Sequence, residues 1–102
     1  MKPTLTTVPP DHSPLVEKIR IENKFGLHLR AAAKLARLAG RFNCSIQIRK
    51  EGKTANAKSV LNLLALALHD EEPFEIVAEG EDAEEALKAI RVLISGKFGE
   101  RE

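Results

Sequence analysis

The sequence predicts a single α+β domain in which an antiparallel sheet carries its helices on one face. Two observations support this fold class. Strand-like and helical stretches follow one another in the order β-α-β-β-α-β-α, and 102 residues suffice for one hydrophobic core. The strand-like stretches alternate apolar and polar residues, as strands do when one sheet face is packed and the other is solvated.

The first 14 residues differ in composition from the rest of the chain. They hold four of its five prolines, with Thr and Ser between them and few apolar side chains. Such a segment has little to anchor it to a core. We therefore expect residues 1–14 to form a flexible, proline-rich extension and residues 15–102 to form the folded domain. His12 lies within the extension, and nothing near it suggests metal binding.

Four stretches favour strands. Residues 19–22, 46–49 and 74–78 alternate apolar and polar side chains, which is typical of half-buried strands. Gly52 stands where a hairpin would turn, so residues 53–57 are expected to form a short partner strand. This strand is less apolar than the others, which favours a position at a sheet edge.

Three stretches have the spacing of helices, and they are residues 29–40, 60–68 and 83–95. The last begins with Asp82 and Glu85 spaced as in a capping box, and Gly96 follows it. The middle helix follows Ser59, whose hydroxyl suits the N-cap position. It carries more apolar side chains than one core-facing stripe holds, so part of it is expected to be exposed; a wholly buried helix is the alternative. His69 is expected near the negative end of this helix.

The composition argues against several classes of function. The 15 acidic and 16 basic residues nearly cancel, so no general field attracts nucleic acid or an anionic membrane. Residues 60–68, the longest apolar stretch, are too few to span a bilayer, and no secretory signal is recognisable. Cys44 is the single cysteine, which fits a reducing cytoplasm, and we expect it to be small, buried and at a strand start. Metal-ligand spacing and a glycine-rich nucleotide loop are both absent, so no metal and no cofactor are expected.

His28 carries the functional prediction. It stands directly before the strong helix formers of residues 29–40, so we expect it at a helix start. The first turn of a helix offers N–H groups and the positive end of the macrodipole to an anion, and Arg30 adds a planar fork of donors. Gly26 can adopt a turn conformation that is closed to other residues. The pattern indicates a histidine that is phosphorylated; a surface or capping histidine is the alternative.

Residues 23–32 resemble the active-site signature of the histidine-containing phosphocarrier protein (HPr) family, N-x-x-G-(L/I)-H-(A/T)-R-P-A. The matching residues are Asn23, Gly26, Leu27, His28, Arg30 and Ala32. The resemblance covers roughly residues 16–98. It implies an open-faced β-sandwich, a four-stranded antiparallel sheet of order 1-4-2-3 with three helices on one face.

The same resemblance implies a function. His28 would take a phosphoryl group on Nδ1 from phosphorylated enzyme I and pass it to IIA proteins or domains of the phosphotransferase system, with Arg30 stabilising the phosphoryl group. The protein would then be a cytoplasmic phosphoryl carrier and not a free-standing enzyme.

Residues 58–64 resemble a second family segment, Lys-Ser-(I/V/L)-(L/M)-x-(L/V)-(L/M). Ser59 is then a regulatory serine and a target of HPr kinase/phosphorylase; a plain N-cap is the alternative. The resemblance also implies a face that meets partner proteins, made of Arg30, Ala33, Val60, Leu61 and Leu64. Two positions depart from the family pattern: Ala31 replaces the usual proline and Asn62 replaces a common glycine.

Two other functions stay open. The first is a regulatory HPr-like module, for instance of a nitrogen-related phosphotransferase branch, whose phosphorylation state controls partner binding. The second is a small nucleic-acid-binding domain. The chain has neither Trp nor Tyr, only four Phe and a net charge of +1, so base stacking and phosphate neutralisation both lack residues.

Overall fold

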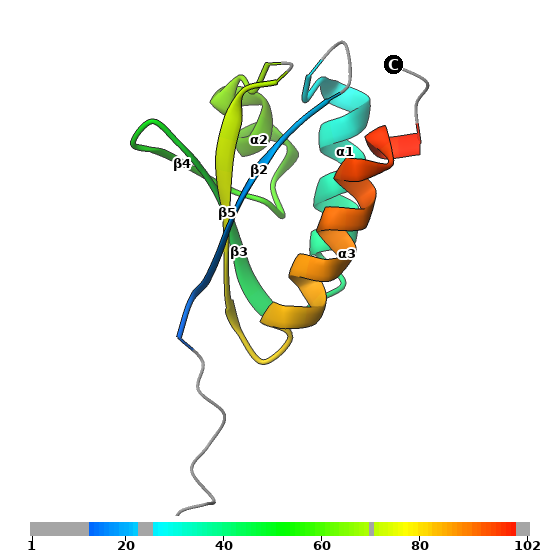
Figure 1. Cartoon of the computed structure of the whole chain (residues 1–102). Helices are drawn as coiled ribbons and strands as arrows, with labels where there is room; N and C mark the ends of the chain where they lie inside the picture. Colours follow the sequence, from blue (N-terminus) through cyan, green and yellow to red (C-terminus); the bar gives the residue numbers. More distant parts are fainter. Residues whose placement is uncertain (1–12, 23–25, 70, 100–102) are drawn as a thin grey trace, which may run out of the picture.

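The computed structural model describes residues 13–22, 26–69 and 71–99, and within them it shows a four-stranded antiparallel sheet covered by helices (Figure 1). The strands are β2 (Leu15–Arg20), β3 (Cys44–Lys50), β4 (Lys53–Asn56) and β5 (Pro73–Gly80), and the helices are α1 (Leu29–Ala39), α2 (Val60–Leu66) and α3 (Ala83–Ser95), followed by a short 3-10 turn, η1 (Lys97–Gly99). The order across the sheet is β2-β5-β3-β4. Counted along the chain this is 1-4-2-3, which confirms the predicted fold class and strand order.

The hydrophobic core lies between one face of the sheet and the helices. In β3, Ile46 and Ile48 are buried, whereas Gln47 and Arg49 are exposed. Because side chains alternate between the two faces of a strand, this pattern identifies the packed face. Side chains from all three helices close the core from the other side, and the fully buried ones include Leu35, Leu63 and Ile90. Burial of each such side chain contributes about 2–3 kcal/mol.

Strand β2 differs from the predicted strand at residues 19–22. It pairs with β5 from Leu15 opposite Ala78 to Arg20 opposite Pro73, so it starts earlier and ends before Ile21, which is nonetheless buried. The ladder stops at Pro73 because proline has no N–H to donate. The expected extension falls outside the described residues except for its last two positions.

The hairpin predicted at Gly52 is present. Glu51 and Gly52 both have positive φ, at 50° and 80°, between the paired residues Lys50 and Lys53. Two central residues with positive φ match the right-handed twist of the flanking strands. Strand β4 is at the sheet edge, as predicted.

The helix ends show where local patterns were misleading. Helix α2 ends at Leu66, two residues earlier than predicted, because Ala67 adopts a left-handed conformation. His69 therefore lies beyond the helix and not at its end. The predicted capping box is wrong: Asp82 occupies the N-cap of α3 but makes no side-chain cap bond, and its Oδ2 instead accepts from the backbone N of Asn43 at 2.6 Å. Helix α1 ends at Ala39, one residue before the predicted limit.

An ion pair fastens the outer strand β2 to α3. Nε and Nη2 of Arg91 on α3 donate to the two carboxylate oxygens of Glu17 on β2. The hydrogen bond from Arg91 lowers the pKa of Glu17. This bidentate pair links α3 to β2, the edge strand of the sheet.

Candidate functional site

His28 is the N-cap residue of α1, so its predicted position at a helix start is confirmed. Its backbone is extended, with φ −82° and ψ 179°, and its carbonyl accepts from the N–H of Ala32 at 2.8 Å. The half-buried imidazole makes no cap hydrogen bond to the helix. An N-cap residue adjoins the N–H groups of the first turn, which suit an anion.

The first turn of α1 contains no acidic residue and has Arg30 exposed at its second position. Helix α3, by contrast, carries Glu84 and Glu85 in its first turn, as the positive end of the macrodipole favours. At α1 the same positive end suits an anion, and a guanidinium at this position suits phosphoryl oxygens.

Ala31, the third residue of this turn, replaces the proline of the family pattern and is completely buried. Alanine is a good helix former, so the first turn forms without proline. Unlike the proline of the family pattern, Ala31 has a backbone N–H, and both His28 and Arg30 are retained beside it. Asn23, the first residue of the signature, lies outside the described residues.

The backbone just before His28 is in close contact with the segment that follows α2. Gly26 has φ +62°, and a Cβ at this position would lie 2.5 Å from the carbonyl oxygen of Leu68. The N–H of Leu27 donates to the same oxygen at 3.1 Å. Gly26 thus meets two demands that only glycine satisfies together, a positive φ and a close backbone approach.

Ser59 is the N-cap of α2, as predicted, and its Oγ accepts from the N–H of Asn62 at 3.2 Å. Asn62 stands where the family pattern commonly has glycine. Its Oδ1 accepts from the N–H of Asn56 at 3.4 Å, so this side chain connects the first turn of α2 to β4. The hydroxyl of Ser59 is half-buried and already has a structural use.

Helices α1 and α2 both carry exposed apolar side chains. Leu61 on α2 is 78% exposed and Leu29 on α1 is 64% exposed, while Ala33, Val60 and Leu64 are half-buried. Helices α1 and α2 pack against each other, and Leu29 follows His28 directly in the chain. The alternative of a wholly buried α2 is therefore wrong. Sequence reasoning missed Leu29, which could have been found as an apolar residue directly after His28.

The remaining candidates give no second site. Cys44 begins β3 as predicted, but it is half-buried, and burial raises the pKa of its thiol. His69 is exposed. In the described part of the chain, no three His, Cys, Asp or Glu side chains come together as a metal site would require. Across the same residues, the helices are all too short or too polar to cross a bilayer.

Comparisons with known proteins agree with this geometry. The family model described as the PTS HPr component phosphorylation site matches residues 15–95. The phosphocarrier protein HPr of Cupriavidus necator is 39% identical over 80% of this chain and 92% of its own length, and the phosphocarrier protein NPr of Shewanella violacea is 44% identical over 84% and 94%. The crystal structure of an HPr from Thermoanaerobacter tengcongensis superposes with a TM-score of 0.83 at 40% identity, covering 86% of this chain and 99% of that one.

Proposed function

The chain belongs to the HPr family of phosphocarrier proteins, and on that premise we propose that His28 accepts a phosphoryl group from phosphorylated enzyme I and passes it to IIA proteins or domains. The observation that carries this proposal is a half-buried histidine at the N-cap of a helix whose first turn contains no acid. We place the relay in the cytoplasm. The chain needs no cofactor for this role, because the phosphoryl group is itself the cargo.

The transfer exchanges one phosphorus–nitrogen bond for another. The bond between phosphorus and the donor nitrogen of enzyme I breaks as a bond to Nδ1 of His28 forms. In a second exchange the bond to Nδ1 breaks as phosphorus bonds to the acceptor. The protein supplies positioning and charge, which are the main requirements of phosphoryl transfer. The N–H groups of the first turn of α1 and the guanidinium of Arg30 take these roles.

The test is incubation with enzyme I and labelled phosphoenolpyruvate, followed by assay of the acid lability of the label. The parent protein should take up acid-labile label and His28→Ala should take up none. His69→Ala is the matched control because it removes an exposed histidine outside α1 and should label like the parent. Label that persisted in His28→Ala would refute the assignment of His28.

A second candidate is a regulatory module of the nitrogen-related branch, whose phosphorylation state controls a binding partner. A phosphocarrier protein NPr, 44% identical to this chain, is among its relatives and supports this candidate. A panel of purified IIA acceptors distinguishes the two. Rapid transfer to sugar-type acceptors supports the sugar branch, and transfer confined to nitrogen-related acceptors supports the regulatory module.

We also propose Ser59 as a site of regulatory phosphorylation by an HPr kinase/phosphorylase. A phosphate there adds nearly two negative charges at the N-terminus of α2, close to the exposed Leu61. It should disturb docking more than folding, because anions are favourable at helix N-termini. Ser59→Asp should slow phosphate uptake by His28, whereas Ser59→Ala, which loses the cap but adds no charge, should not. An equal rate in Ser59→Asp and the parent would count against this role.

A further inference from the structure

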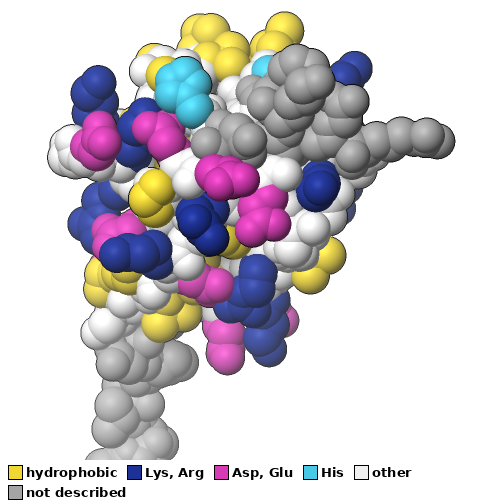
Figure 2. Space-filling view, turned by 45° about the horizontal axis from the view of Figure 1, so that its top comes forward, with side chains coloured by type: hydrophobic (Ala, Val, Ile, Leu, Met, Phe, Trp, Pro, Cys, Tyr) yellow, Lys and Arg dark blue, Asp and Glu magenta, His cyan; other side chains and the backbone are white. Residues whose placement is uncertain are grey.

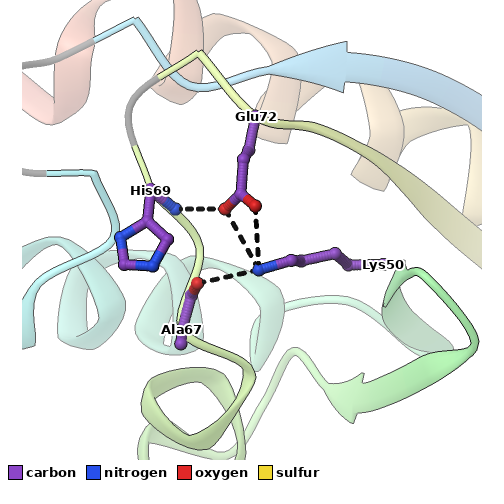
Figure 3. Close-up of polar contacts among 4 residues, drawn as sticks. All are labelled: Lys50, Ala67, His69 and Glu72. Carbon is purple, nitrogen blue, oxygen red and sulfur yellow. Dashed lines mark hydrogen bonds and ion pairs between the residues drawn. The ribbon is translucent and has the colours of Figure 1, made fainter.

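Lys50 is a charged residue on the packed side of the sheet. It follows Ile46 and Ile48 in the alternation of β3, so its side chain points to the helix-covered face, and only 11% of that side chain is exposed. Its Nζ donates to the carbonyl of Ala67 at 3.0 Å and lies 3.1 Å from each carboxylate oxygen of Glu72 (Figure 3). We call Lys50, Ala67 and Glu72 the Lys50 clamp.

The Lys50 clamp joins the two ends of the connection between α2 and β5, because Ala67 directly follows α2 and Glu72 directly precedes β5. Oε1 of Glu72 also accepts from the backbone N–H of His69 at 2.7 Å (Figure 3). The N–H of Glu72 donates to the carbonyl of His69 at 3.2 Å. Ala67 and Glu71 have φ of 57° and 63°, which is unfavourable for residues with a Cβ. Strained residues persist only where surrounding contacts hold them, and the clamp supplies such contacts.

The same connection holds the segment that precedes His28. Leu68 lies between Ala67, which Lys50 contacts, and His69, whose N–H donates to Glu72. The carbonyl of Leu68 accepts from the N–H of Leu27 at 3.1 Å. Gly26 packs so closely on Leu68 and His69 that a Cβ would not fit. His28 follows Leu27 directly, so an unbroken series of backbone contacts leads from the clamp to the N-cap of α1.

We propose that Lys50 and Glu72 are positioning residues for phosphoryl transfer at His28, an inference that rests on the proposed function. The ammonium of Lys50 fixes Ala67 and Glu72, and these fix the carbonyl of Leu68 against which Leu27 and His28 are aligned. Without the clamp, the connection relaxes from its strained conformation and the imidazole loses its alignment with the first turn of α1. Phosphoryl transfer is sensitive to displacements of about 1 Å.

The chain offers a matched control on the neighbouring residue. Arg49 of β3 forms an exposed ion pair with Glu75 of β5 at 3.0 Å, on the face of the sheet opposite to Lys50. Loss of this pair removes a charge and a β3–β5 contact without touching the α2–β5 connection. Lys50→Met and Arg49→Met therefore differ in whether the clamp is broken.

The experiment measures the rate of phosphorylation by enzyme I at varied concentrations of each protein, at a temperature where circular dichroism shows all variants to be folded. Lys50→Met should lower kcat about tenfold with little change in KM, because alignment and not docking is lost. Arg49→Met should match the parent in both. Lys50→Arg, which keeps a cationic donor, should recover most of the rate.

Two further measurements test the route. Glu72→Gln should lower kcat, and the double variant with Lys50→Met should be no slower than the slower single variant, because both changes break one clamp. The amide NMR signals of Leu27 and His28 should shift in Lys50→Met but not in Arg49→Met. Equal kcat for Lys50→Met and the parent overturns the inference and leaves the proposed function intact, whereas a parent protein that accepts no phosphate overturns the proposed function itself.

Discussion

At the scale of single residues, backbone conformation decides how the His28 segment is placed. Gly26 and Gly52 both have positive φ, but only Gly26 lies against another part of the backbone. The surroundings of Gly52 are open, with nothing within 4 Å of a Cβ placed there. The two glycines therefore separate the effect of conformational strain from the effect of close contact.

We predict that Gly26→Ala is far more harmful than Gly52→Ala. Gly52→Ala should lower the free energy of unfolding by about 1 kcal/mol, the strain of a Cβ at positive φ, and should leave phosphate uptake unchanged. Gly26→Ala adds a clash with the carbonyl of Leu68, so it should lower stability by roughly 2–4 kcal/mol and slow uptake. Urea denaturation and labelling measure both effects. Similar losses in the two variants would contradict the contact seen at Gly26.

Ala67 gives a prediction of the opposite sign. This residue ends α2 in the left-handed conformation, with φ 57° and ψ 56°, a position at which glycine is commonly favoured. Ala67→Gly should raise the free energy of unfolding by up to about 1 kcal/mol because it relieves the strain of the Cβ. Ala65→Gly, two residues earlier in the helix, should instead lower it by about 1 kcal/mol. Thermal unfolding measures both variants. If both substitutions shifted the unfolding midpoint in the same direction, the strain assigned to Ala67 would be wrong.

At the scale of elements, the sequence patterns predicted which segments form, but for most of them not where they begin or end. The alternation around Ile46 and Ile48 and the apolar spacing of α3 are local signals, and both elements lie where predicted. The ends depend on partners distant in sequence. Strand β2 ends opposite Pro73, the first residue of β5, and the carboxylate of Asp82 accepts from the N–H of Asn43 instead of capping its own helix.

The α2–β5 connection shows the same limit for the site. The positions of His28 and Ser59 followed from helix-start signals that are local in sequence. The contact of Lys50 with Ala67 joins residues 17 apart, and no pattern in either segment indicates the other. The one available signal was the phase of Lys50 with Ile46 and Ile48, which places a charge on the packed face of the sheet.

The pH dependence of stability tests this connection. The backbone N–H of His69 and the ammonium of Lys50 lower the pKa of Glu72 below its ordinary value of 4.5. A carboxyl with a lowered folded-state pKa stabilises the protein above its unfolded-state value, and that contribution is lost as pH falls through the lowered value. Glu72→Gln should therefore be less stable than the parent at pH 7, and the difference should shrink as pH falls below about 4.5. If the difference in urea midpoint between Glu72→Gln and the parent stayed constant from pH 7 to below about 4.5, the charge of the Glu72 carboxylate would not be the cause of that difference.

At the scale of the whole molecule, charge and apolar surface are distributed differently. Acidic and basic side chains are interspersed over the face shown in Figure 2, so no single-sign field covers it. Exposed large apolar side chains occur at separate places: Leu29 and Leu61 on the packed pair α1 and α2, Val92 on α3, and Leu15 and Val16 at the start of β2. Because exposed apolar groups beside a reactive residue favour docking, the α1–α2 surface is the expected partner face.

Substitutions at that surface should weaken docking without unfolding the protein. Arg30→Glu combined with Leu61→Asp reverses a charge and places a carboxylate on a side chain that is 78% exposed. We expect the Kd for enzyme I to rise at least about tenfold, equivalent to about 1.4 kcal/mol, with the unfolding midpoint little changed. Val92→Asp is the matched control, since it puts the same charge on an equally exposed apolar residue of α3. Titration calorimetry with unphosphorylated enzyme I keeps docking separate from the chemistry of Arg30, and Leu61→Asp alone isolates the apolar contribution. If Val92→Asp weakened binding as much as Leu61→Asp, general repulsion would replace the α1–α2 surface as the explanation.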